Sequence, residues 1–224
     1  MTCAVYLPPS QSDSKFPSLM YLSGLTCTDE NVCQKGAAFR SLAENQIAFI
    51  CPDTSPRNVG VPGEDDSWDF GTGAGFYLDA TESPWSQNYR MYSYVTQELP
   101  EVIASNFPQI DVNTMSITGH SMGGHGALTI ALKNPDRFRS VSAFAPICNP
   151  TNCPWGVKAF SGYLGADQTA WREFDTCELL RSRGASSYTD ILIDVGLADG
   201  FLENQLKPDA LQEVCDNVDQ RVSI

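Results

Sequence analysis

Histidine is almost absent from this chain, which has only two in 224 residues. Basic residues are also scarce: 14 lysines and arginines stand against 27 aspartates and glutamates, for a formal net charge of −13. Because phosphate groups and anionic lipids repel such a chain, we expect neither a nucleic-acid partner nor a membrane partner. The eight cysteines form no CxxC pair, so a zinc site has little support, and we expect no metal and no cofactor.

Long apolar runs are absent as well. No stretch approaches the roughly 18 consecutive apolar residues of a transmembrane helix. Residues 1–9 contain no basic region followed by an apolar run, so no signal peptide is predicted. Without a secretion signal, the cysteines are expected to be buried and reduced, although their even number leaves disulfides as an alternative.

The composition and the hydrophobic pattern of the chain predict an α/β fold. Hydrophobic residues make up 42% of the chain and charged residues 18%, which suits one domain over residues 1–224. Apolar runs predict strands, and helical spacing predicts helices between them, with Pro100 expected to kink or split one helix. Such an alternation predicts a mostly parallel sheet covered by helices on both faces. The predicted strands are 4–7, 19–22, 47–50, 115–118, 141–145, 191–195 and 222–224, and the predicted helices are 34–45, 89–105, 122–133 and 207–217.

The segment 53–88 has no clear periodicity and is rich in glycine, proline and acidic residues. A connection this long in a compact domain is usually functional, so we interpret it as a lid or binding loop beside an active site. The alternative is a surface excursion that packs on itself through its aromatic residues. Those residues are Trp68, Phe70, Phe76, Tyr77 and Trp85.

The strongest motif is the run 119–126, Gly-His-Ser-Met-Gly-Gly-His-Gly, which contains GxSxG around Ser121. It follows a predicted strand and opens a predicted helix, the context of a nucleophile elbow. A serine on such a tight turn exposes its hydroxyl, and side chains at positions 119 and 123 would crowd the turn. The N-terminus of the following helix offers N–H groups to an oxyanion. We therefore predict that Ser121 is a catalytic nucleophile.

A serine nucleophile needs a base and an acid that orients the base, and in this fold the acid follows the serine in the chain. Asp199 lies in a turn just after the predicted strand 191–195 and is the preferred candidate. Asp194, inside that strand, is the alternative, and Asp199 could instead only cap its turn. The amides of Leu25 and Met122 are the candidate oxyanion donors.

Six segments in order along the chain resemble the S-formylglutathione hydrolase family, also called esterase D. The resemblance implies an α/β-hydrolase fold and a cytoplasmic thioesterase and carboxylesterase that hydrolyses S-formylglutathione to glutathione and formate in formaldehyde detoxification. It also implies Ser121 and Asp199 as catalytic residues, Leu25 and Met122 as oxyanion donors, Cys27 as a thiol near the site, and a possible homodimer. Trp155 is a candidate for the acyl pocket or for the core. The segments are SGLTCT at 23–28, PDTSPR at 52–57, DFGTGAGFY at 69–77, NYRMYSY at 88–94, the elbow at 119–126 and FAPICNP at 144–150.

The resemblance further implies a catalytic histidine after the final strand, where this chain has reached Ile224. We therefore expect a form truncated at both ends, without the C-terminal strand and helix, whose own turnover is low or absent. His120 and His125 match family elbow positions and are not expected to replace the missing histidine. The alternatives are a non-catalytic or incomplete product that only binds ligand, and a general esterase or acyltransferase on the same fold.

Overall fold

The computed structural model describes residues 1–9 and 15–224, and its strands follow the predicted order. Four strands pair in the order β1-β3-β2-β4 and three more in the order β5-β6-β7. Two parallel bridges, Ile117 to Val141 and His120 to Phe144, join β4 to β5. Apart from the antiparallel pair of β1 and β3, the pairings are parallel. The strands are β1 (Cys3–Tyr6), β2 (Phe16–Leu22), β3 (Ala48–Pro52), β4 (Ile110–Gly119), β5 (Ser142–Phe144), β6 (Ile191–Asp194) and β7 (Val222–Ser223).

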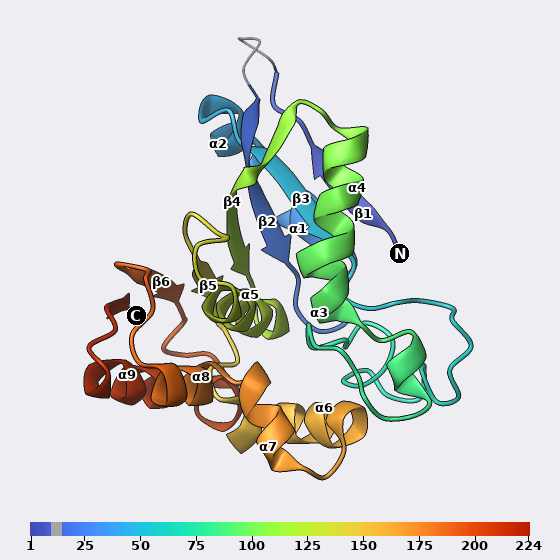
Figure 1. The fold of residues 1–224 in the computed structure, drawn as a ribbon, viewed down its shortest axis with the longest axis vertical. Helices are drawn as coiled ribbons and strands as arrows, with labels where there is room; N and C mark the ends of the chain where they lie inside the picture. The colour runs from blue at the N-terminus through green and yellow to red at the C-terminus, as the bar shows by residue number, and fades with distance from the viewer. Residues whose placement is uncertain (10–14) are drawn as a thin grey trace.

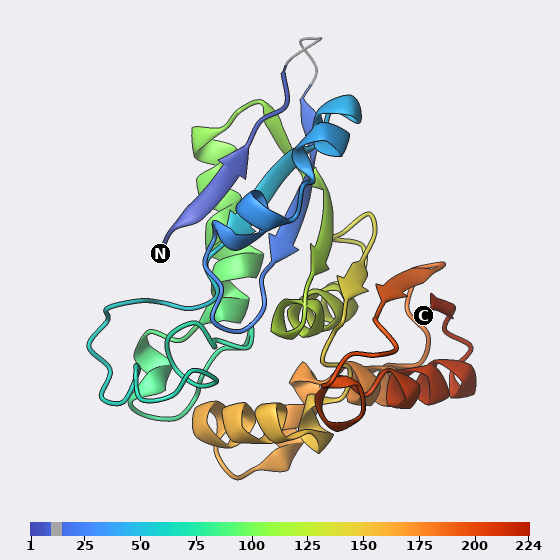
Figure 2. The ribbon, with the colours of Figure 1, turned by 180° about the vertical axis from the view of Figure 1, so that it is seen from behind.

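Helices lie on both faces of these strands. α4 and α5 cover one face (Figure 1), where α5 packs on β2, β4 and β5. α1 and α2 lie on the opposite face, which Figure 2 shows from behind. These layers confirm the predicted α/β-hydrolase architecture. The α-helices are α1 (Asn31–Lys35), α2 (Phe39–Glu44), α3 (Met91–Ser93), α4 (Leu99–Asn106), α5 (Met122–Lys133), α6 (Pro154–Leu164), α7 (Gln168–Trp171), α8 (Thr176–Arg183) and α9 (Pro208–Asn217).

Two predicted helices are divided in the structure. The helix expected over 34–45 is replaced by α1 and α2, because α1 ends at Lys35 and Ala37 takes a positive φ of 50°. The helix expected over 89–105 consists of α3, a π-helical turn at Tyr94–Glu98, and α4. Pro100 lies in the first turn of α4, where its missing N–H is tolerated. The expected split is therefore present, but it precedes the proline.

The helices α6, α7 and α8 were not predicted. Their ends nevertheless carry recognisable signals: α6 starts at Pro154 and is followed by Gly165, whose φ is 80°. Asp175 caps α8 by accepting a hydrogen bond from the Glu178 N–H at 3.0 Å. The residues at the helix ends therefore indicate these helices more clearly than their hydrophobic spacing does.

The segment 53–88 has no strand and one short 3₁₀ helix, Trp85–Gln87. It does not pack only on itself, since Phe76 and Tyr77 are fully buried in the main core. The Tyr77 hydroxyl donates to the Ser23 carbonyl oxygen at 2.8 Å, next to the loop that follows β2. Trp68 differs from these aromatics because 57% of its surface is exposed.

All eight cysteines are free thiols in the described parts of the chain, and five of them are buried. Cys3, Cys27 and Cys33 are only partly buried, so the expectation of buried thiols holds in full for the other five alone. Among the described residues, no helix combines the length and apolarity needed to cross a bilayer.

Candidate active site

Ser121 lies between the end of β4 and the start of α5, as the motif predicts. Its backbone has φ 57° and ψ −119°, a conformation that is strained for a residue with a side chain. A Cβ at Gly123 would lie 1.9 Å from the Leu22 carbonyl oxygen, and one at Gly119 would lie 2.2 Å from the Gly123 oxygen. The predicted crowding is therefore confirmed. The Ser121 N–H donates to the Phe144 oxygen at 2.9 Å, which fixes the elbow against β5.

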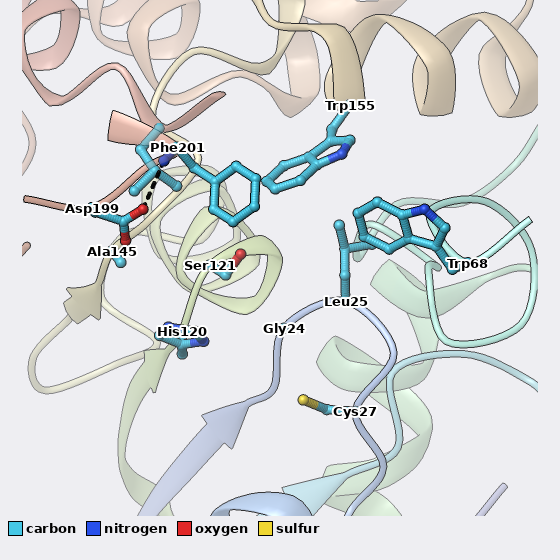
Figure 3. Close-up of a pocket in the computed structure, with 11 residues that line it drawn as sticks. Gly24, Leu25, Cys27, Trp68, His120, Ser121, Ala145, Trp155, Asp199 and Phe201 are labelled. Carbon is cyan, nitrogen blue, oxygen red and sulfur yellow. Dashed lines mark hydrogen bonds between the residues drawn. The ribbon is translucent and has the colours of Figure 1, made fainter. Parts of the chain in front are cut away.

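Ser121 opens into a cavity of about 340 Å³, which we call the serine cavity (Figure 3). Of the residues predicted for the site, Leu25, Cys27, Ser121 and Asp199 line it, although they come from distant parts of the chain. Met122 is fully buried and contributes no lining surface. The complete lining is Gly24, Leu25, Cys27, Trp68, His120, Ser121, Ala145, Trp155, Asp199, Phe201 and Leu206.

Asp199 lies in the turn after β6, on the wall of the serine cavity. Its Oδ1 accepts a hydrogen bond from the Phe201 N–H at 2.8 Å, so it also caps its own turn (Figure 3). Asp194 is the last residue of β6, its backbone oxygen accepts from the Ala145 N–H at 2.7 Å, and it does not line the cavity. The geometry thus favours Asp199 over Asp194 as the acid near the serine.

The turn after β2 brings Leu25 to the cavity. The N–H groups of the next two residues have backbone acceptors: the Thr26 N–H donates to the Gly73 oxygen at 2.9 Å, and the Cys27 N–H donates to the Gly24 oxygen at 3.3 Å. The N–H of Leu25 has no backbone acceptor in the described part of the chain. Met122 is the first residue of α5, where an N–H has no partner within the helix.

An ion pair and two hydrogen bonds hold this turn. The Arg57 guanidinium donates to both carboxylate oxygens of Asp53, at 2.7 and 2.8 Å. The Cys27 carbonyl oxygen accepts from Arg57 Nη2 at 2.9 Å and from the Thr54 hydroxyl at 2.5 Å. Burial raises the pKa of the Cys27 thiol, which keeps it neutral near pH 7.

Neither histidine hydrogen-bonds to Ser121 Oγ or to Asp199 in the described residues. The His125 ring is fully buried, and its Nε2 lies 3.1 Å from the Phe76 carbonyl oxygen, so Nε2 carries the proton. Burial lowers the pKa of His125 to about 4. His120 lines the cavity; partial burial lowers its pKa, and the Asp199 charge offsets part of that shift.

Three aromatic residues form one wall of the serine cavity, which we call the aromatic wall: Trp68, Trp155 and Phe201. The rings of Trp68 and Trp155 meet edge to face at 5.8 Å, and those of Trp155 and Phe201 are 4.8 Å apart. The wall places the predicted Trp155 at the cavity, where it is 8% exposed. Phe201, in a turn, and Leu206, at the end of the π-helical stretch Leu202–Leu206, were missed because no local pattern marks such residues as cavity lining.

Comparison with known proteins shows which family the chain belongs to. The Esterase family model matches residues 1–223. S-formylglutathione hydrolase of Rattus norvegicus is 57% identical over 216 residues, which are 96% of this chain and 76% of the relative. The Arabidopsis thaliana S-formylglutathione hydrolase is 54% identical over 219 residues, covering 97% and 76%.

Solved structures give the same result. An S-formylglutathione hydrolase from Agrobacterium tumefaciens superposes with a TM-score of 0.94 at 51% identity, covering 99% of this chain and 79% of that one. The Staphylococcus aureus serine hydrolase FphF, 20% identical with a TM-score of 0.74 over 99% of this chain and 82% of its own, shares the fold. With its serine elbow and this degree of identity, the chain is an esterase that belongs to the S-formylglutathione hydrolase family of α/β-hydrolases.

Proposed function

We propose that this chain is a serine hydrolase of S-formylglutathione, with carboxylesterase activity, and that Ser121 is its nucleophile. The observation that supports this most directly is the strained elbow, which presents Ser121 to a cavity shared with Asp199 and Leu25. The names of the relatives supply the substrate. Cys27 is a bystander thiol in this proposal.

In the proposed reaction, Ser121 Oγ attacks the carbonyl carbon of the formyl thioester. The amides of Leu25 and Met122 donate to the oxyanion that forms. The C–S bond then breaks, glutathione leaves as the thiol after taking up a proton, and a formyl ester remains on Ser121. Water attacks this ester and releases formate, so one thioester and one water give one thiol and one formic acid.

The attack requires a base between Ser121 and Asp199. His125 donates to a backbone carbonyl, and His120 makes no hydrogen bond to either residue in the described part of the chain. Absence of an oriented base lowers turnover by about 10⁴- to 10⁶-fold, while oxyanion stabilisation retains a small rate. Free imidazole is small enough for the serine cavity, and we expect it to accelerate acylation of Ser121 by these 224 residues.

The experiment measures formate release from S-formylglutathione and labelling of serine by a fluorophosphonate, each with and without imidazole. Ser121→Ala should abolish both signals, whereas Ser105→Ala, on the exposed end of α4, should leave them unchanged. Formate release by Ser121→Ala at the wild-type rate would refute the proposal. Binding of a thioester without any labelling, even with imidazole, would favour a non-catalytic binding protein instead.

We also propose that residues 1–224 form one domain with a binding loop at 53–88, located in the cytoplasm and forming a homodimer. The domain and loop are supported by the packing of Phe76 and Tyr77 in the core and by Trp68 at the cavity. The compartment and the dimer rest on the family resemblance. Light scattering on the purified chain tests the dimer, and a mass of one chain would reject it.

A further inference from the structure

We propose that Trp68 determines specificity for the thiol half of the substrate, and that Lys158 on α6 positions it. The inference concerns the same cavity as the proposed hydrolysis and rests on it for the identity of the thiol. Trp68 belongs to the segment 53–88 and meets Trp155 of α6 in the aromatic wall (Figure 3).

The aromatic wall runs from the buried part of the serine cavity to its rim, so the two halves of a thioester would contact different parts of it. A formyl group is one carbon and one oxygen beyond the sulfur, so it occupies only the space next to Ser121. The rest of the cavity and its rim are left for the thiol half, which is a peptide. Trp155 is only 8% exposed, whereas Trp68 and Phe201 are 57% and 52% exposed, as expected for rings at the rim. An exposed indole face packs well on amide planes and methylene groups.

A cluster of three polar side chains, which we call the Lys158 cluster, holds Trp68 through the residues on either side of it. Its members are Ser67, Asp69 and Lys158. The Lys158 ammonium donates to Ser67 Oγ at 2.7 Å and to Asp69 Oδ1, and the Ser67 hydroxyl donates to the same Asp69 oxygen at 2.6 Å. Both residues that flank Trp68 are therefore bound by one side chain.

The ionisation of Asp69 is consistent with this cluster. Partial burial alone would raise the pKa of the carboxyl, but the hydrogen bonds from Lys158 and Ser67 lower it below its ordinary value. Lys158 lies three residues after Trp155 on α6, one helical turn away. The Lys158 cluster thus holds Trp68 next to α6, the helix that carries Trp155.

A second anchor follows Trp68 in the chain. The Phe70 ring stacks on Tyr163 of α6 with a centroid distance of 4.5 Å, and a Cβ on Gly162 would lie 2.4 Å from the Phe70 ring. The Tyr163 hydroxyl accepts from the Gly71 N–H at 2.9 Å and donates to the Ala74 oxygen at 3.0 Å. With Phe70 locked, the Lys158 cluster is the contact that decides where the indole of Trp68 points.

The first test is binding of S-methylglutathione, a thioether that cannot be hydrolysed, measured by titration calorimetry. Trp68→Ala should weaken binding about tenfold, because one aromatic contact with the peptide is lost. Labelling of Ser121 by a small fluorophosphonate should change less than about twofold, since that probe does not reach the rim. Equal affinity of wild type and Trp68→Ala, or no binding to either, would overturn the proposal.

The second test separates positioning from direct contact. Two indoles held edge to face at 5.8 Å should give an exciton couplet in the far-ultraviolet circular dichroism spectrum. Lys158→Met should lose this couplet, as Trp68→Phe should, and should weaken S-methylglutathione binding in the wild-type background but not in the Trp68→Ala background. Arg40→Met, which removes an exposed ion pair on α2, is the matched control and should change nothing.

An intact couplet in Lys158→Met would refute the positioning role, and so would additive losses in the double variant, which would mean that Lys158 contacts the ligand itself. Failure of this inference is distinguishable from failure of the proposed function. If formate release depends on Ser121 but S-methylglutathione binds equally well without Trp68, only the inference is wrong. If Ser121→Ala keeps formate release, the proposed function is wrong whatever Trp68 does.

Discussion

The buried imidazole of His125 should make the protein sensitive to mild acid. Its pKa in the folded protein is about 4, because burial disfavours the charged ring, against 6.5 in an unfolded chain. A histidine with a lowered folded pKa stabilises the native state above pH 6.5, and this contribution is lost as the pH falls from 6.5 towards 4. Between pH 7 and pH 5 the two pKa values predict a loss of about 2 kcal/mol in the free energy of unfolding.

The perturbation is His125→Gln, whose amide can still donate to the Phe76 carbonyl oxygen but does not titrate. Urea unfolding in reducing buffer, followed by the fluorescence of the four tryptophans, gives the free energy of unfolding at pH 7 and pH 5. Wild type should lose about 2 kcal/mol more than the variant over this interval. His120→Gln is the comparison: because the Asp199 charge offsets part of the lowering of the His120 pKa by burial, this variant should reduce the acid sensitivity less than His125→Gln does.

Equal losses in wild type and His125→Gln would refute the reasoning, because carboxylates elsewhere would then account for all of the acid sensitivity. The same variant also tests the assignment of His125 as a structural residue. Fluorophosphonate labelling of Ser121 at pH 7 should be unchanged in His125→Gln, since the His125 ring donates to a backbone carbonyl and does not line the serine cavity. A large loss of labelling in a stably folded variant would mean that His125 acts in catalysis.

Three further outcomes are expected. Gly123→Ala should lower the free energy of unfolding by about 3 kcal/mol or more and abolish labelling of Ser121, because its Cβ would lie 1.9 Å from the Leu22 oxygen. Gly196→Ala is the control: a Cβ there meets open space, so the variant should be as stable as wild type in the same urea assay. Tyr163→Phe should lower the free energy of unfolding by about 2 to 4 kcal/mol, since it leaves two buried backbone groups unpaired. Alkylation of Cys27, followed by mass spectrometry, should accelerate about tenfold per pH unit between pH 7 and 9. Only the thiolate reacts, and the raised pKa of Cys27 keeps the thiolate fraction small in this range. An alkylation rate that does not change with pH would contradict this.

Much of the site was readable from the sequence because its signals are local. The elbow needs small residues at fixed offsets from Ser121, and the helix predicted over 122–133 begins and ends as observed. Asp199 was proposed from its position after a strand, and it lines the serine cavity. Backbone geometry within a few residues decided these features, so a pattern of a few residues was enough to reveal them.

Local patterns failed where one segment depends on a distant one. The helical spacing over 34–45 did not reveal the break at Ala37, and the capping signals of α6 and α8 were overlooked beside weak periodicity. Nothing local distinguishes Trp68, which remains at the cavity rim, from Phe76, which enters the main core.

The amino-acid sequence by itself determined the order of the strands, the position of the serine elbow and the proposal of Ser121 as the nucleophile. Only the tertiary structure decided which side chains surround that serine. The loop at 53–88 meets α6 about ninety residues later through the Lys158 cluster and the Phe70 stack. The physical reason is that such contacts depend on where two separate elements are held by the sheet, and no periodicity within either element encodes that distance.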